Sequence, residues 1–144
     1  MSVLNTQLDF FMKPISQETI MGCAVACCAS LSGLSYKKMQ DYFDNGKLKE
    51  QTTGFYNKDI VSALNRVGIK AKGYSIKGWG NKKIMIGTIV FIKRSKKYPK
   101  GHFLLKTKRG WMNPWINYPN INPARAGFQK ELPGKVDWVI EVIR

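Results

Sequence analysis

A cysteine, a histidine and an asparagine occur along this sequence in an order that suits nucleophilic catalysis by a thiol. Cys23 follows Gln17 by six residues, and His102 is the only histidine among the 144 residues. Asn113 comes after it in an Asn-Pro-Trp segment. An imidazole can take the proton of a thiol, and the thiolate then attacks a carbonyl carbon. If imidazole acts as a general base in this chain, it must be that of His102.

Only one of the three cysteines has the sequence context of a nucleophile. A run of small apolar residues over 22–33, ended by Gly33, predicts a buried helix with Cys23 at its N-terminus. Unpaired N–H groups and the helix macrodipole favour an anion there, so we expect a lowered pKa for this thiol. Cys27 and Cys28 lie one turn further along the apolar run and are expected to be packing residues.

The strand pattern predicts how the histidine is oriented. His102 opens an expected strand directly after Gly101, and a turn at 108–110 leads into the antiparallel neighbour that carries Asn113. The amide oxygen of Asn113 can then accept a hydrogen bond from the imidazole and orient the ring. Trp115, two residues further, is expected on the same face, where it would shield that hydrogen bond from water.

A loop before the nucleophile supplies a further candidate. The side-chain amide of Gln17, together with the backbone N–H of Cys23, can stabilise a tetrahedral oxyanion. A glutamine in a loop has no functional signal by itself, and only its spacing to Cys23 marks it. Gly22, Gly101 and Trp115 are expected to form the rim of the substrate site.

The hydropathy pattern predicts helices first and strands second, within one α+β domain over residues 1–144. Further helices are expected over 35–43 and from a cap at Asn57 to Gly68, separated by a polar loop over 47–54. A turn is expected at 78–81 and an irregular segment over 118–133. The expected strands cover 69–76, 87–93, 101–108, 111–115 and 136–143.

The charge is strongly basic, with 24 lysines and arginines against 9 acidic residues and a net charge of +15. Such a field attracts an anionic partner such as nucleic acid, a membrane surface or a cell-wall polymer, although a lysine-rich solvated surface is the alternative. A basic cluster over 93–100 is expected to form a hairpin loop at the rim of the cleft, where it could attract an acidic substrate. Trp79, Trp111 and Trp138 could stack on bases or pack against the protein.

Several classes of protein do not fit the sequence. No run approaches the roughly 20 apolar residues of a membrane span, and residues 1–13 lack the pattern of a secretory signal. We therefore expect a protein that is cytoplasmic at synthesis, and leave open its delivery to another cell or compartment as a toxin or effector. Three clustered cysteines suit a reducing compartment. Without zinc-site spacing or a nucleotide or calcium motif, no cofactor is expected.

Taken together, these features resemble those of the papain-like cysteine peptidase superfamily. Within that superfamily, this compact sequence is most similar to the leader-peptide peptidase domains of bacteriocin-exporting transporters. The corresponding stretches are 17–29, 101–105 and 113–114. Two departures stand out: Gly22 and Ala24 around the cysteine reverse the usual Cys-Gly order, and Asn113 replaces the Asp of the leader peptidases. No transporter segment follows, so a free-standing domain is expected.

The resemblance implies a papain-like fold, with N-terminal helices packed on a C-terminal antiparallel sheet, and thiolate acyl transfer on a peptide or protein substrate. Cys23 would be the nucleophile, His102 the general base and later acid, Asn113 the residue that orients the ring, and Gln17 the oxyanion donor. Deamidases, transglutaminases and cell-wall amidases share such folds. The residues leave two alternatives open: a basic nucleic-acid-binding module and a catalytically inactive papain-like binding protein. They give no oligomeric state.

Overall fold

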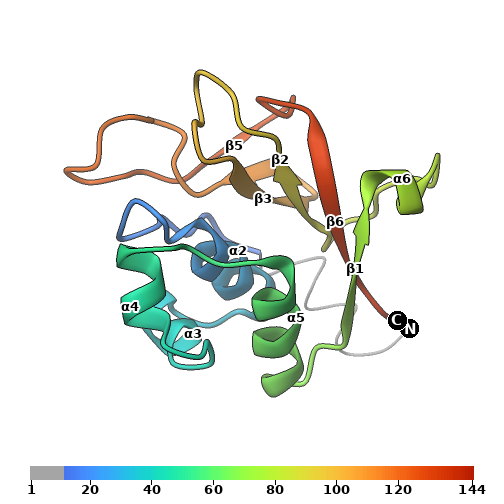
Figure 1. Cartoon of the computed structure of the whole chain (residues 1–144), viewed down its shortest axis with the longest axis horizontal. Helices are drawn as coiled ribbons and strands as arrows, with labels where there is room; N and C mark the ends of the chain where they lie inside the picture. The colour runs from blue at the N-terminus through green and yellow to red at the C-terminus, as the bar shows by residue number, and fades with distance from the viewer. Residues whose placement is uncertain (1–11) are drawn as a thin grey trace.

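Helices occupy the first half of the chain and pack against an antiparallel sheet in the computed structural model, which describes residues 12–144 (Figure 1). The predicted order of helices before strands is confirmed. Residues 1–13, in which no secretory signal was expected, lie mostly outside the described range. No described helix is long and apolar enough to cross a membrane. The helices of this half are α2 (Cys23–Ser32), α3 (Tyr36–Gln40), α4 (Gly46–Gln51) and α5 (Asn57–Arg66).

The second half forms a six-stranded sheet with the spatial order β1-β6-β2-β3-β4-β5, in which every pair is antiparallel. The last strand of the chain inserts between β1 and β2, so that β2 and β3 lie at the centre. A short helix, α6 (Ile76–Trp79), follows the first strand. The strands are β1 (Ala71–Ser75), β2 (Ile89–Ile92), β3 (His102–Thr107), β4 (Gly110–Asn113), β5 (Gly127–Gln129) and β6 (Val136–Val142).

Helix α2 is the centre of the core. Every residue from Ala24 to Leu31 is buried, and the helix contacts α3, α5 and β3. Its small side chains let these neighbours approach closely, while Ile60 and Leu64 on α5 and Leu105 on β3 complete the packing. Because one side of α2 packs on the central sheet, its N-terminal residue is held beside the start of β3.

Two segments that were predicted to be irregular contain regular structure. The polar segment 47–54 includes α4, whose Glu50 is buried and accepts hydrogen bonds from the Tyr36 hydroxyl at 2.6 Å and the Gln40 amide at 2.5 Å. The segment 118–133 includes β5, which pairs with β4. Both assignments depend on contacts with distant residues, which local hydropathy does not report.

Two boundary predictions need correction. Of the turn expected at 78–81, Gly78 and Trp79 belong to α6, and only Gly80 and Asn81 form a turn. Helix α6 begins after Ser75, whose hydroxyl accepts from the Gly78 N–H. Helix α5 is capped by Tyr56 rather than by Asn57, because the Asp59 carboxylate accepts the Tyr56 backbone N–H at 2.7 Å.

The glycine that precedes the candidate histidine predicts a measurable stability difference. Gly33 and Gly101 both have φ of 76°. A Cβ at position 33 would meet nothing within 4 Å, whereas one at 101 would collide with the Phe91 ring and lie 2.9 Å from the Ile92 carbonyl oxygen. Gly33→Ala should therefore cost about 1–2 kcal/mol of unfolding free energy for the left-handed backbone alone. Gly101→Ala should cost about 1–3 kcal/mol more.

Urea unfolding of the two variants measures this difference directly. Equal losses at the two positions would show that the packing around Gly101 has no such constraint.

Candidate active site

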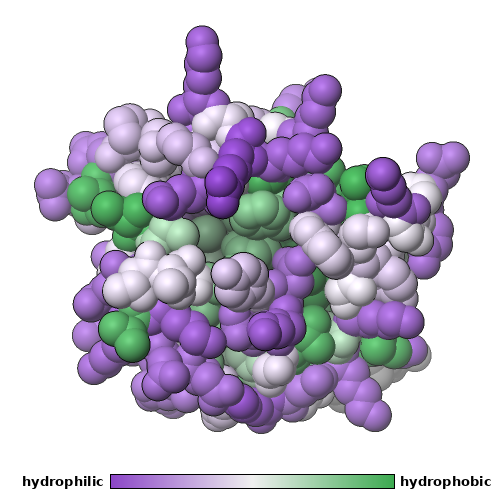
Figure 2. Space-filling view, viewed as in Figure 1, coloured by the Kyte–Doolittle hydropathy of each residue, from purple (hydrophilic) through white to green (hydrophobic). Residues whose placement is uncertain are grey.

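The thiol of Cys23 lies where the N-terminus of α2 meets the first residues of β3. Cys23 is partly accessible to solvent, and the backbone of Phe103, next to His102, is close enough to hydrogen-bond to its sulfur. Figure 2 shows a hollow in the surface between the helical half and the sheet, with moderately hydrophobic residues at its floor. The nucleophile and the sole histidine predicted from the sequence are thus brought to the same region of the fold.

The predicted lowering of the Cys23 pKa was wrong. Burial raises this pKa from 9.0 to about 11, although hydrogen bonds from the backbone at Phe103, Ala24 and Cys23 itself act in the opposite direction. The helix N-terminus is present as expected, but the loss of water around the sulfur outweighs it. The resting thiol is therefore protonated at neutral pH. The predicted packing roles of Cys27 and Cys28 fit the structure, since both are fully buried.

The imidazole of His102 is buried and neutral. Its exposed fraction is 2%, and burial lowers its pKa from 6.5 to about 4; the hydrogen bond with Asn113 raises the pKa, and the nearby Lys97 cation lowers it further. Because the thiol pKa lies far above the imidazole pKa, the resting pair consists of a neutral thiol and a neutral imidazole.

The amide of Asn113 determines which imidazole nitrogen bears the proton. The backbone N–H of Trp115, which can only donate, lies 2.9 Å from Asn113 Oδ1 and so identifies that atom as the oxygen. His102 Nε2 lies 2.7 Å from the same oxygen. An oxygen can only accept, so Nε2 must carry a hydrogen. In the neutral ring, Nδ1 is then unprotonated and is the nitrogen that can accept a proton.

The orientation of Asn113 is supported by two further hydrogen bonds. Its Nδ2 donates to the Tyr98 hydroxyl at 3.0 Å and to Gln129 Oε1 at 2.7 Å. The Tyr98 hydroxyl in turn donates to the carbonyl of Trp115 at 3.0 Å. Every donor and acceptor of the fully buried Asn113 amide is therefore used.

The ring that stacks on the imidazole belongs to Tyr98. The two rings are 4.2 Å apart and inclined by 4°. Trp115 contributes its backbone N–H and carbonyl to the network, and its indole donates to the Asn120 carbonyl. Its predicted role as a shield of the His102–Asn113 hydrogen bond stays a prediction. Sequence reasoning missed Tyr98 because it lies in a lysine-rich loop, where a lone aromatic residue among lysines was the only available signal. It missed Gln129 because β5 was not predicted.

The two predicted rim glycines have steric reasons to be glycine. Gly101 needs its positive φ and lies against Phe91. A Cβ on Gly22 would collide with the Tyr36 hydroxyl, which donates to the buried Glu50. The Gly-Cys order, which departs from the peptidases that the sequence resembles, thus has a local cause, since a hydroxyl occupies the space of a side chain.

Gln17 lies in the loop that leads into α2 and is buried. Its backbone N–H donates to the Pro114 carbonyl at 3.2 Å, which joins this loop to the segment after β4. Both hydrogens of its side-chain amide are used by the Thr19 and Ile20 carbonyls, at 2.9 and 3.0 Å. To donate to an oxyanion, Gln17 would have to release one of these bonds. The oxyanion role of Gln17 stays a prediction.

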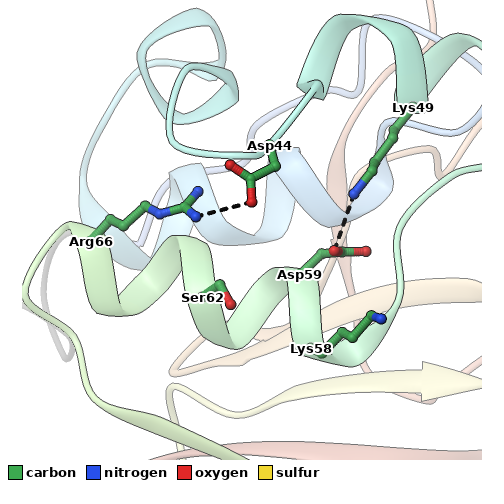
Figure 3. Close-up of a pocket in the computed structure, with 6 residues that line it drawn as sticks. All are labelled: Asp44, Lys49, Lys58, Asp59, Ser62 and Arg66. Atoms are coloured by element: carbon green, nitrogen blue, oxygen red, sulfur yellow. Dashed lines mark hydrogen bonds and ion pairs between the residues drawn. The ribbon is translucent and has the colours of Figure 1, made fainter.

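A second hollow lies in the helical half and has no candidate catalytic residue. Figure 3 shows that two ion pairs cross it, Lys49–Asp59 at 3.2 Å and Arg66–Asp44 at 3.1 Å. Its charged groups largely neutralise one another. The hollow has a volume of about 320 Å³ and is lined by Asp44, Lys49, Lys58, Asp59, Ser62 and Arg66.

Over residues 12–144 no group of three or more His, Cys, Asp or Glu side chains could hold a metal ion.

Comparison with solved structures identifies the fold. The chain is similar to the crystal structure of the peptidase domain of Streptococcus ComA, a bi-functional ABC transporter involved in a quorum-sensing pathway. The match covers 91% of this chain and 97% of that chain, with a TM-score of 0.56 and 13% sequence identity. The chain therefore has the papain-like α+β fold predicted from its sequence. At this identity the likeness establishes the fold alone. No protein-family model and no curated protein sequence matches the chain.

The different exposure of the three cysteines predicts selective and pH-dependent alkylation. Iodoacetamide should modify Cys23 and spare Cys27 and Cys28, whose side chains have no exposed surface. Because the Cys23 pKa is about 11, the rate should rise steadily between pH 6 and pH 9. Mass spectrometry of the modified peptides measures both results. A rate that is already constant from pH 5 would reveal a preformed thiolate and contradict the neutral pair.

The low pKa of His102 predicts a loss of stability in acid. Histidine in the unfolded chain has a pKa near 6.5, whereas the folded value is about 4, so protons bind preferentially to the unfolded state between these values. The stabilisation by the neutral ring is complete above pH 6.5 and is lost as the pH falls toward 4. At pH 4.5 the loss should be about 2–3 kcal/mol of unfolding free energy.

Urea unfolding at pH 7 and pH 4.5 tests this loss. His102→Gln should show a smaller drop than the wild type, because its side chain does not titrate. Parallel drops in both proteins would place the acid sensitivity in the carboxylates instead.

Proposed function

We propose that this chain is a cysteine peptidase that cleaves peptide bonds by thiolate acyl transfer. The observation that supports it most is the hydrogen bond between His102 Nε2 and Asn113 Oδ1, which leaves Nδ1 available as a base. The backbone of the next residue, Phe103, is within hydrogen-bond reach of the Cys23 sulfur. A buried, oriented base and a cysteine residue that is partly accessible are the groups that nucleophilic catalysis requires.

In the proposed first step, the Cys23 proton passes to His102 Nδ1 as the sulfur attacks the carbonyl carbon of the substrate. Because the resting pair is neutral, proton transfer accompanies the attack instead of preceding it. Asn113 stabilises the imidazolium that forms, since its oxygen remains the acceptor of the Nε2 hydrogen.

The tetrahedral intermediate carries a negative charge on the former carbonyl oxygen. The first N–H groups of α2 have no partner within the helix, so the backbone N–H of Cys23 is one donor in the proposal. Gln17 is the second, provided that its amide exchanges one carbonyl for the oxyanion. A donor in such a position contributes about 3–4 kcal/mol to transition-state stabilisation.

In the second half of the reaction the imidazolium returns its proton to the leaving amine, and the carbon–nitrogen bond breaks. The acyl group remains on Cys23 as a thioester. His102 then takes a proton from water as the water oxygen attacks the thioester carbon. The carbon–sulfur bond breaks, the acid is released, and the imidazolium returns its proton to the Cys23 sulfur. The proposal includes release of the acyl group to water rather than to an amine. It also includes the closer likeness of this chain to leader-peptide peptidases.

The proposal predicts loss of turnover without loss of the fold. Cys23→Ala should lower peptide cleavage by at least about 10³-fold, because no other thiol can reach the substrate. Its circular dichroism spectrum and urea midpoint should stay close to those of the wild type, and Cys27→Ser serves as the control for thiol loss elsewhere.

An electrophilic peptide probe followed by mass spectrometry identifies the reacting cysteine. Modification of Cys23 that disappears in His102→Ala supports the proposal. Wild-type turnover by Cys23→Ala would eliminate it.

A further inference from the structure

The net charge of the protein lies almost entirely in the half of the chain that forms the sheet. Residues 70–144 contain 17 basic and 3 acidic residues, a net charge of +14. Residues 1–69 contain 7 basic and 6 acidic residues, a net charge of +1. The ion pairs Lys49–Asp59 and Arg66–Asp44 both belong to the helical half. The sheet half of the sequence is therefore strongly positive, and the helical half is nearly neutral.

The strongest local concentration of this charge lies next to the histidine. The loop between β2 and β3, residues 93–100, rises above the sheet in Figure 1. Figure 2 shows hydrophilic side chains crowding that edge of the molecule. Within this loop there is no acidic residue. Its five cations are all exposed: Lys93, Arg94, Lys96, Lys97 and Lys100.

A chain of contacts connects these cations with the imidazole. The Lys97 ammonium lies 5.8 Å from the centre of the Tyr98 ring, and that ring stacks on His102 at 4.2 Å. The Tyr98 hydroxyl is held by Asn113 and by the Trp115 carbonyl. Tyr98 thereby anchors the basic loop beside the imidazole of the candidate site.

The chemistry of acyl transfer indicates which part of a substrate would meet this loop. The imidazolium must deliver a proton to the leaving amine, so the amine must lie within hydrogen-bond reach of His102. The residues that follow the cleaved bond continue from that amine, on the imidazole side of the site. They would therefore pass the loop that Tyr98 holds over the ring.

We infer that the substrate is a peptide with acidic residues on the carboxyl side of the cleaved bond, recognised by the basic loop 93–100. This inference rests on the proposed peptidase function. The loop cations attract carboxylates both at encounter and in the complex, and both effects weaken with salt.

The composition of the loop favours a peptide over a nucleic acid. Four of its five cations are lysines, whereas bidentate contacts to phosphate and to guanine favour arginine. Its only aromatic residue, Tyr98, is buried with an exposed fraction of 2% and cannot stack on a base. Of the tryptophans that were candidates for base stacking, Trp79 is buried, and the exposed Trp138 lies on β6, outside this loop.

Cleavage-site profiling tests the inference without a known substrate. A peptide library made from a digested proteome is incubated with the enzyme, and mass spectrometry identifies the cleaved bonds. In wild-type enzyme, Asp and Glu should be enriched about threefold to tenfold within the first six positions after the cleaved bond. Raising the salt concentration from 50 to 500 mM should reduce this enrichment.

Two double variants with equal changes in net charge separate the local effect from the overall charge. Lys96→Glu with Lys97→Glu should abolish the acidic preference. The matched control, Lys37→Glu with Lys38→Glu on the exposed surface of α3, should retain it. Loss of the preference in both variants would show that only the overall charge matters and would overturn the inference.

The remaining outcomes are also distinct. Cleavage with no acidic enrichment, or with enrichment before the cleaved bond, overturns the inference and leaves the peptidase function standing. Loop-dependent binding of a DNA or RNA oligonucleotide, together with an unselective cleavage profile, assigns the loop to nucleic acid instead. A wild-type enzyme that reacts with the electrophilic probe but cleaves no peptide overturns both proposals.

Discussion

The buried amide of Asn113 is the group on which the arrangement of the candidate site depends. It joins four parts of the sheet half, because it bonds to His102 at the start of β3, Tyr98 in the β2–β3 loop, Gln129 on β5 and the backbone of Trp115. An unsatisfied buried amide would cost about 1–3 kcal/mol for each missing partner. This cost holds the imidazole in one orientation and in one tautomer. The hydrogen bond from Asn113 to the Tyr98 hydroxyl also anchors the basic loop 93–100 beside the His102 ring.

Burial gives this site a different electrostatic balance from the one that a helix N-terminus alone would produce. The macrodipole favours a thiolate by about 0.3–2 kcal/mol. The net effect has the opposite sign, since the pKa of Cys23 rises by about two, which corresponds to roughly 3 kcal/mol in favour of the thiol. His102 is displaced in the complementary direction. In the proposed reaction both charges therefore form together, and the Asn113 oxygen and the α2 N–H groups are the groups proposed to stabilise them.

The parts of the fold that were predictable are those that local sequence determines. The apolar run at 22–33 could only be a buried helix, and the turn at 108–110 set Asn113 beside the strand of His102, whose hydrogen bond the structure contains. Helix α4 and strand β5 were missed, because a buried Glu50 and a three-residue edge strand depend on distant partners. The predicted lowering of the Cys23 pKa was wrong for the same reason. The sequence indicated the helix, but it did not indicate how deeply the thiol is buried.

The most direct test of this account is the protonation state of the sole histidine. With only one histidine in the chain, ¹⁵N-histidine labelling gives a single imidazole whose two nitrogens can be assigned by NMR. At pH 7 we expect a protonated Nε2 and an unprotonated Nδ1, with the ring titrating near pH 4. A proton on Nδ1 in the neutral ring, or titration near pH 6.5, would contradict the role assigned to Asn113.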